Sequence, residues 1–562
     1  MLLLDWIILI GTLVFIVAYG AYKTRGSKNV QDYLRGGNEA KWWTVGLSVM
    51  ATQASAITFL STPGQAFHSG MGFVQFYFGL PIAMIIICMV FIPIYYRLEV
   101  YTAYEYLESR FDRKTRSLTA LLFLTQRGLS AGITIFAPAI ILSAVLGWDL
   151  TTLNIIIGVL VIIYTVSGGT KAVNVTQKQQ MAVIFFGMIT AFVLIIQYLP
   201  EEISFTKALE IAGASGKLDI LDFSFDFDNR YTFWSGIIGG TFLALSYFGT
   251  DQSQVQRYLS GKSVQQSQLG LIFNGLLKVP MQFFILLVGV MVFVFYQFNY
   301  SPLNFNPAAT KAVTNSELAS EYEELENELN FIQTQKQEKS LKYARAEDFS
   351  SGNRESFKQD MLQLNEAEIS TRQKASNIIA EADESVETND KDYVFIHFIL
   401  NNLPRGLIGL LLAVILSAAM SSTASELNAL ASTTVIDLYK RNIGDRSDEH
   451  FVKASKWFTL AWGLIAILVA SFAELFDNLI QLVNIIGSIF YGNVLGIFLL
   501  AFFIKYVRSN AVFVAALITQ GLIIGIYFME IMPYLWLNLT GCVLVMGIAF
   551  LLQKLDNIRK IA

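Results

Sequence analysis

The chain has 562 residues, of which 54% are hydrophobic and 15% are charged, and its mean hydropathy is +0.50. Typical soluble proteins carry roughly 25% charged residues, so this composition excludes an ordinary soluble domain. The net charge of -4 disfavours a nucleic-acid partner. The two cysteines, Cys88 and Cys542, are too few for a disulfide framework and lack metal-ligand spacing.

Long apolar runs recur along almost the whole chain and predict an all-α polytopic membrane protein with about 13 transmembrane helices. The first run lacks the basic flank and cleavage site of a signal peptide, so we expect a retained helix. The predicted spans are residues 5–22, 43–62, 72–96, 118–146, 151–168, 181–199, 232–250, 267–297, 403–436, 455–474, 478–505, 510–529 and 533–553.

Basic residues concentrate in alternate loops of this prediction. Lys and Arg gather in residues 23–41, 97–116, 439–456 and 553–560. Because Lys and Arg are retained on the cytoplasmic side, we expect the N-terminus outside and the C-terminus in the cytoplasm. The localisation that follows is the cytoplasmic (plasma) membrane.

Residues 315–391 form a highly charged insertion between the eighth and ninth predicted spans. Apolar residues at roughly helical spacing predict a helical hairpin, and the span count places it outside. Two interpretations are open, a docking element for an extracytoplasmic protein partner and a tolerated insertion. The second is favoured.

Two predicted spans are unusually rich in polar residues, which are costly in hydrocarbon and need a reason. Residues 48–65 read "SVMATQASAITFLSTPGQ" and residues 417–434 read "SAAMSSTASELNALASTT". The hydroxyls can bond to the carbonyl one turn earlier, permit close helix packing, or present oxygen to a hard cation. Two such interruptible segments in distant parts of the chain suggest an ion site between repeats.

Spans two to six and spans seven to eleven form two sets of five, and an odd number makes the second set inverted. The expected organisation is a first helix and loop, two inverted repeats separated by an extracytoplasmic loop, and two C-terminal helices with a short cytoplasmic tail. The corresponding residues are 1–41, 42–199, 200–231, 232–505 (interrupted by 315–391) and 506–562.

Four stretches resemble the sodium:solute symporter family, and within it the branch of iodide, monocarboxylate and multivitamin transporters. They are "FIPIYYRLEVYTAYEYLESRFDRKTR" (91–116), "SGGTKAVNVTQKQQ" (167–180), "GTDQSQVQRYLSGKS" (249–263) and "SSTASELNALASTTVIDLYKR" (421–441). The resemblance covers about residues 40–505 outside the insertion. It implies a five-plus-five inverted-repeat transporter core.

The resemblance also implies a sodium site between the second and ninth spans, with Na+ as the transported coupling ion. Its ligands would be the backbone carbonyls of Ala51, Ala54 and Ala418 and the hydroxyls of Ser421 and Ser422. Neutral oxygens suit a hard monovalent cation, whereas carboxylate-rich cages favour divalent ions. Glu426, one turn further on, is left out of the predicted site.

One departure from the family pattern concerns a second sodium. The usual Trp-Thr-Asp reads Val175-Thr176-Gln177 here, and one of two later hydroxyl positions is Ala424 beside Ser425. The missing carboxylate and hydroxyl favour a single sodium ion.

The resemblance places the solute beside the ion, at the interface of the two repeats. The expected substrate-binding residues come from the second, third and seventh spans. They are Thr58, Thr62, Phe76, Tyr77, Leu80, Tyr247 and Phe248.

The function implied is sodium-coupled uptake of a small organic solute by alternating access, with a monocarboxylate-, vitamin- or sialic-acid-like anion favoured. A neutral sugar or other neutral solute is the alternative, as is a transporter-like membrane sensor, although only "KLDNIRKIA" follows residue 553. An enzyme is not expected, because three histidines occur without a phosphate loop or metal spacing. A proton in place of sodium is disfavoured, since the predicted ion site holds no carboxylate.

Overall fold

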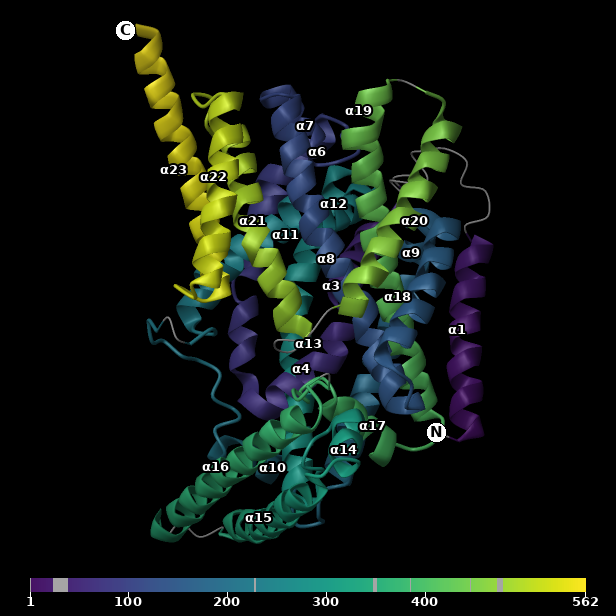
Figure 1. The fold of residues 1–562 in the computed structure, drawn as a ribbon, viewed down its shortest axis with the longest axis vertical. Helices are drawn as coiled ribbons and strands as arrows, with labels where there is room; N and C mark the ends of the chain where they lie inside the picture. The colour runs from purple at the N-terminus through teal and green to yellow at the C-terminus, as the bar shows by residue number, and fades with distance from the viewer. Residues whose placement is uncertain are drawn as a thin grey trace.

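The computed structural model describes residues 2–23, 39–226, 229–346, 351–384, 386–444, 446–472 and 479–561. Most of these residues are helical, and their only β-type pairing is an isolated bridge between Ala40 and Gly261. Nine helical stretches within them are long and apolar enough to cross a membrane, and two shorter apolar helices accompany them. The predicted all-α polytopic membrane fold is thereby confirmed (Figure 1).

The second predicted span is a broken helix. Helix α3 (Trp42–Gln53) ends before Ala54, and α4 (Ala56–Ser69) begins after Ser55, whose backbone is extended (φ -74°, ψ 177°). Met50 still accepts the N–H of Ala54 at 2.7 Å, but the carbonyls that follow it in α3 lack the backbone N–H groups that a continuing helix would supply. Pro63, which follows this break, lies inside α4.

The third predicted span is irregular. It is built from η2 (Gly70–Tyr77), α5 (Leu80–Ile86), η3 (Ile87–Phe91) and α6 (Ile92–Arg97). The segment η3 is a π-helix, whose turns are wider than those of an α-helix. Pro93, near the start of α6, follows it and has no backbone N–H to donate. These interruptions turn the aromatic side chains of η2 toward the interior of the molecule.

The fifth and sixth predicted spans are joined in one helical run. Helix α9 extends from Leu150 to Gln197, where two helices and a loop were predicted. The sequence from Leu150 to Gln197 contains no proline, so every residue of α9 keeps its backbone N–H donor. The side chains at 167–176 lie outside the described part of the chain.

The remaining core helices follow in chain order. They are α1 (Leu3–Lys23), α7 (Glu105–Arg110), α8 (Arg113–Leu146), α10 (Phe205–Ala214), η4 (Ser235–Gly239), α11 (Gly240–Thr250), α12 (Gln252–Leu259), α13 (Val264–Phe298), α18 (Leu407–Thr433), η5 (Thr434–Tyr439), α19 (Lys440–Ile443), α20 (Asp448–Phe472), α21 (Leu479–Phe503), α22 (Ser509–Phe528) and α23 (Tyr534–Ile561). Helix α18 packs against α8 and α9, and also contacts α3 and α4.

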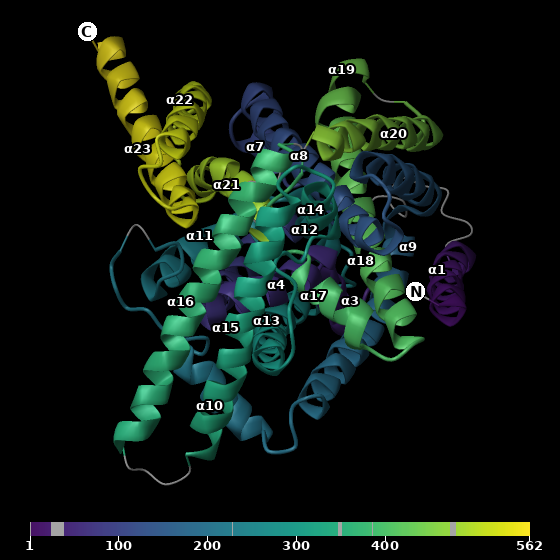
Figure 2. The same cartoon turned by 60° about the horizontal axis from the view of Figure 1, so that its bottom comes forward.

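The charged insertion contains the predicted helical hairpin. Its long helices α15 (Ala319–Arg345) and α16 (Ser351–Ala382) pack side by side, flanked by the short helices α14 (Pro307–Thr314) and α17 (Val394–Asn402) (Figure 2). In Figure 1 the hairpin and the N-terminus lie at one end of the molecule and the C-terminus lies at the other.

Candidate functional site

The hydroxyl groups of α18 are mostly satisfied within their own helix. Ser422 donates to the carbonyl of Ala418 at 3.0 Å, and Ser425 donates to the carbonyl of Ser421 at 2.9 Å. Contrary to the sequence-based expectation that this span can be interrupted, α18 runs unbroken from Leu407 to Thr433. The hydroxyl of Ser421 is buried without a hydrogen-bond partner in the described part of the chain.

The five predicted sodium ligands lie on two elements that pack against each other. Ala51 and Ala54 occupy the end of α3 and the break after it, while Ala418, Ser421 and Ser422 lie on α18. All five are buried. The break leaves carbonyl oxygens without helical donors, and Ser421 offers an unused hydroxyl, so both elements present the kind of oxygen that a monovalent cation needs.

Gln177, which the sequence resemblance aligns with a family aspartate, makes two hydrogen bonds to α3. Its Oε1 accepts from Ser48 Oγ at 2.8 Å, and its Nε2 donates to Thr52 Oγ1 at 3.2 Å. Because this amide is neutral and already bonded, it brings no carboxylate to a second ion. The side chain of Thr176 lies outside the described part of the chain.

A cavity of about 100 Å³ lies beside the break in α3–α4. It collects six of the seven predicted substrate-binding residues, namely Thr58, Phe76, Tyr77, Leu80, Tyr247 and Phe248. The predicted ion ligand Ser422 lines the same cavity. Thr62 does not line it, because it lies one turn beyond Thr58 and accepts a hydrogen bond from Gln282 of α13 at 3.2 Å.

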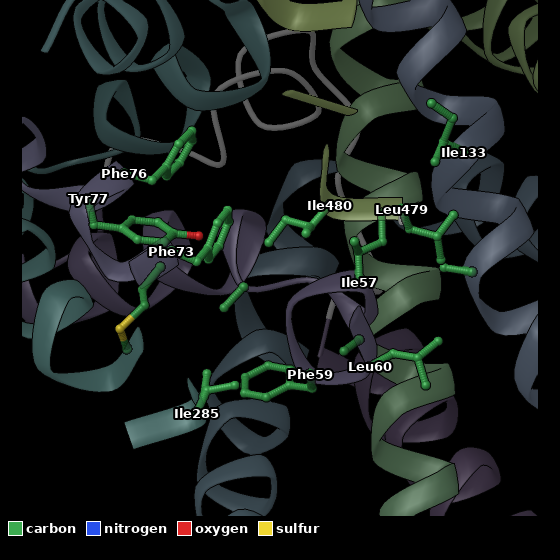
Figure 3. Packing of buried hydrophobic residues seen from close by; sticks show 14 of the residues in the cluster. Ile57, Phe59, Leu60, Phe73, Phe76, Tyr77, Ile133, Ile285, Leu479 and Ile480 are labelled. Carbon is green, nitrogen blue, oxygen red and sulfur yellow. The ribbon is translucent and has the colours of Figure 1, made fainter. Parts of the chain in front are cut away.

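Aromatic rings form one wall of this cavity. The rings of Phe76 and Tyr77 meet edge to face with centroids 4.8 Å apart, and Phe73 stacks on Phe76 at 5.4 Å. Figure 3 shows these three side chains gathered on one side, with Ile57 and Ile480 across from them. Such a wall suits an apolar portion of a small solute.

The opposite part of the cavity holds a charged network that the sequence-based prediction missed. Arg127 of α8 pairs with Glu426 of α18 at 3.0 Å. It also pairs with Asp251, the N-cap residue of α12. Tyr491 of α21 donates to Asp251 at 3.0 Å, and Thr134 donates to Glu426 at 2.8 Å. All of these side chains are buried, and the guanidinium lies 5.4 Å from the ring centre of Tyr247.

Glu426, which was left out of the predicted sodium site, lines the central cavity together with Arg127. The missed signal was the presence of ionisable residues inside apolar helices. Such residues are costly in a membrane and generally mark functional positions. The expectation that the predicted ion site holds no carboxylate concerned its five ligands alone, and it stays a prediction.

A family model described as "Sodium:solute symporter family" matches residues 33–329 and 376–519, which is more than half of the chain. The chain belongs to the sodium:solute symporter family. The two matched segments leave out residues 330–375, which lie within the hairpin.

Individual relatives agree with this membership. The chain is 28% identical to human sodium-coupled monocarboxylate transporter 1, over 90% of this chain and 70% of the relative. It is 27% identical to the sodium/sialic acid symporter SiaT of Proteus mirabilis, over 90% and 86% of the two chains. It is 33% identical to the human sodium/iodide cotransporter over 48% of this chain and 42% of the relative.

A solved structure gives the fold. The substrate-bound outward-open state of a Na+-coupled sialic acid symporter superposes with a TM-score of 0.75 at 22% identity, covering 99% of this chain and 98% of that one. This symporter is thus an integral membrane protein with a five-plus-five inverted-repeat core, and Na+ is its coupling ion. The relatives named here are transporters, and sodium and a small solute are what this family carries.

Proposed function

We propose that this symporter carries a small organic carboxylate inward together with sodium. The observation that carries the proposal is Arg127, the one cationic side chain among the described residues that line the central cavity. A guanidinium is well suited to hold a carboxylate by paired hydrogen bonds. The cavity volume of about 100 Å³ suits a solute of a few carbon atoms, and two of the relatives are named for organic acids.

A neutral polar solute is the second candidate, and the same network favours it. Arg127 already pairs with both Asp251 and Glu426, so one cation faces two carboxylates before any solute binds. A carboxylate solute would have to displace Glu426 from the guanidinium, leaving that side chain on Thr134. A neutral solute could bond to the network without this exchange.

Uptake into proteoliposomes separates these candidates. Short monocarboxylates would be tested under an inward sodium gradient, each beside its amide of nearly the same shape. We expect at least one acid to accumulate while its amide does not.

Arg127→Gln should reduce that uptake at least tenfold. Arg116→Gln, which removes another buried arginine of α8 away from the cavity, should retain uptake in correctly inserted protein. Accumulation of amides without a response to acids would instead support the neutral solute.

For the ion we propose a single site made by the carbonyls of Ala51, Ala54 and Ala418 and the hydroxyls of Ser421 and Ser422. The helix break and the unpartnered Ser421 hydroxyl support this assignment. The neutral amide of Gln177, at a position where the family pattern has a carboxylate, supports one ion rather than two.

We also propose that the hairpin end of the molecule faces outward. Basic residues at the ends of α6, α7 and α19 and at the start of α8 lie at the opposite end, where the C-terminus lies (Figure 1). Cytoplasmic loops retain Lys and Arg, so this end would be cytoplasmic. The basic residues Arg25, Lys28 and Arg35, which contributed to the sequence-based prediction, lie outside the described residues.

A further inference from the structure

A second cavity of about 210 Å³ lies where the hairpin meets the transport core. The core contributes Phe67 and His68 from the end of α4, Phe293 and Tyr296 from α13, and residues that follow α10. The hairpin helices α15 and α16 supply the facing wall. None of the residues that line the central cavity lines this one, so the two cavities are separate.

Three cationic side chains surround this second cavity. Lys217 follows α10, Lys336 belongs to α15 and Arg372 to α16. Glu368 faces them and pairs with Lys336 at 2.5 Å and with Arg372 at 2.9 Å. The other carboxylate of the lining, Glu366, is exposed. The buried part of the site therefore has an excess of positive charge.

Several hydrogen-bonding groups of the lining are unused. Both side-chain atoms of Asn365 and the hydroxyl of Ser215 are buried without a partner in the described part of the chain. The ammonium group of Lys217 donates to the carbonyl of His68 at 2.6 Å, which employs one of its three N–H groups. Buried groups of this kind are costly unless a ligand or ordered water completes their bonds.

Aromatic rings form the rest of the wall. The Lys217 ammonium lies 4.7 Å from the ring centre of Phe293, and Phe67 meets the same ring edge to face at 6.0 Å. Tyr296 meets Phe67 at the same distance. Cations beside an apolar wall match a ligand that has both a negative group and a short hydrocarbon body.

We propose that this cavity is a second, sodium-independent binding site for a small organic carboxylate, with Lys217 and Lys336 facing the negative group. The inference goes beyond the transport function, because the site lies between the hairpin and the core rather than beside the predicted ion ligands. A carboxylate bound there would hold the hairpin against the end of α4, the helix whose first turns line the central cavity.

The ionisation of Lys217 supports this proposal. The pKa of its ammonium is lowered to about 8, mainly by burial and also by the neighbouring Lys336, while Glu368 opposes the change. The lysine is charged below this pKa and neutral above it. Affinity for a carboxylate should therefore fall as the pH rises through about 8. The other charged or titratable side chains of the cavity lining are His68, Tyr296, Glu366 and Arg372.

Calorimetric titration of the purified full-length protein with butyrate, in sodium-free buffer, tests the site. Wild type should bind butyrate more tightly than sulfate, which lacks an apolar body. Lys217→Met should weaken butyrate binding at least tenfold. Lys339→Met is the matched control, because Lys339 pairs with Asp360 across the hairpin at 2.6 Å but does not line the cavity. This control should bind butyrate as wild type does.

The opposite results would overturn the proposal. They are the absence of sodium-free butyrate binding, equal affinity in Lys217→Met, tighter binding of sulfate, or an equal loss in both lysine variants. Because the readout is binding without sodium, these failures leave the transport proposal untouched. Failure of Arg127-dependent uptake would equally leave this second site standing.

Discussion

At the scale of single residues, the hydroxyls of α18 differ by what they already bind. Ser422, Thr423 and Ser425 each donate to a carbonyl one turn earlier, so their oxygens are held in place by the helix itself. Ser421 has no such bond. Adjacent serines thus differ in availability, and Ser422 lines the central cavity beside the helix break whereas Ser425 does not.

The availability of the Ser421 and Ser422 oxygens leads to the first prediction. Ser421→Ala and Ser422→Ala should each raise the sodium concentration for half-maximal uptake by about tenfold, which corresponds to roughly 1.4 kcal/mol of lost ion binding. Ser425→Ala is the matched control and should leave sodium dependence unchanged if one ion is bound. Sodium titration of uptake checks all three variants. Unchanged sodium dependence in both site variants would contradict the assignment.

At the scale of elements, α13 carries a row of buried polar residues. Asn274, Lys278 and Gln282 follow one another at intervals of one turn and are all fully buried. Gln282 bonds to Thr62, but the ammonium group of Lys278 has no hydrogen-bond partner in the described residues and lies 5.6 Å from the ring centre of Tyr77. An unsatisfied amine in such a place lowers the stability of the fold.

Lys278→Met should therefore stabilise the protein by roughly 1–3 kcal/mol, because it removes an unpaired polar group and nearly conserves volume. Lys336→Met provides the contrast, since it breaks a pair with Glu368 and should destabilise. That pair, with Arg372, holds the pKa of Glu368 at about 2 despite burial. Thermal unfolding in detergent at pH 7 measures both. A lower unfolding temperature for Lys278→Met would show that its ammonium makes a favourable interaction.

At the scale of the whole molecule, the hairpin is tightly attached to the core. Arg372 donates to the carbonyls of Pro302 and Leu303, and Gln333 donates to Ser301 Oγ at 2.6 Å. The stretch after α16 also reaches the core, because a Cβ at Gly64 would lie 1.8 Å from the carbonyl oxygen of Lys391. The docked hairpin nevertheless contributes no residue to the central cavity.

Replacing residues 319–384 with a short Gly/Ser linker should consequently leave sodium-driven uptake within a few-fold of wild type. Leu318 and Val386, at the two ends, pack against the same small cluster, so a short linker can join them. The unfolding temperature should fall, and sodium-free butyrate binding should disappear with Lys336 and Arg372. Uptake by proteoliposomes and calorimetry check these outcomes. A correctly inserted variant without uptake would show that the hairpin takes part in transport.

The sequence by itself determined the membrane class, the family and the aromatic residues on the wall of the central cavity. Long apolar runs are a local property that a bilayer requires, and motifs such as "YEYLESRF" are read without knowledge of contacts. The polar composition of residues 48–65 likewise predicted a segment that can unwind, and the break at Ala54–Ser55 lies within it.

The tertiary structure alone decided which charges meet. Arg127, Asp251, Glu426 and Tyr491 come from four helical segments, and their pairings join residues between 124 and 364 positions apart. Local periodicity places each of them on a helix but cannot say which helices pack together. The same holds for Lys217 and Arg372, which the docked hairpin brings to one cavity. A charged residue inside an apolar helix predicts that a partner exists. Which residue is the partner depends on how the helices pack, and the sequence alone does not decide that.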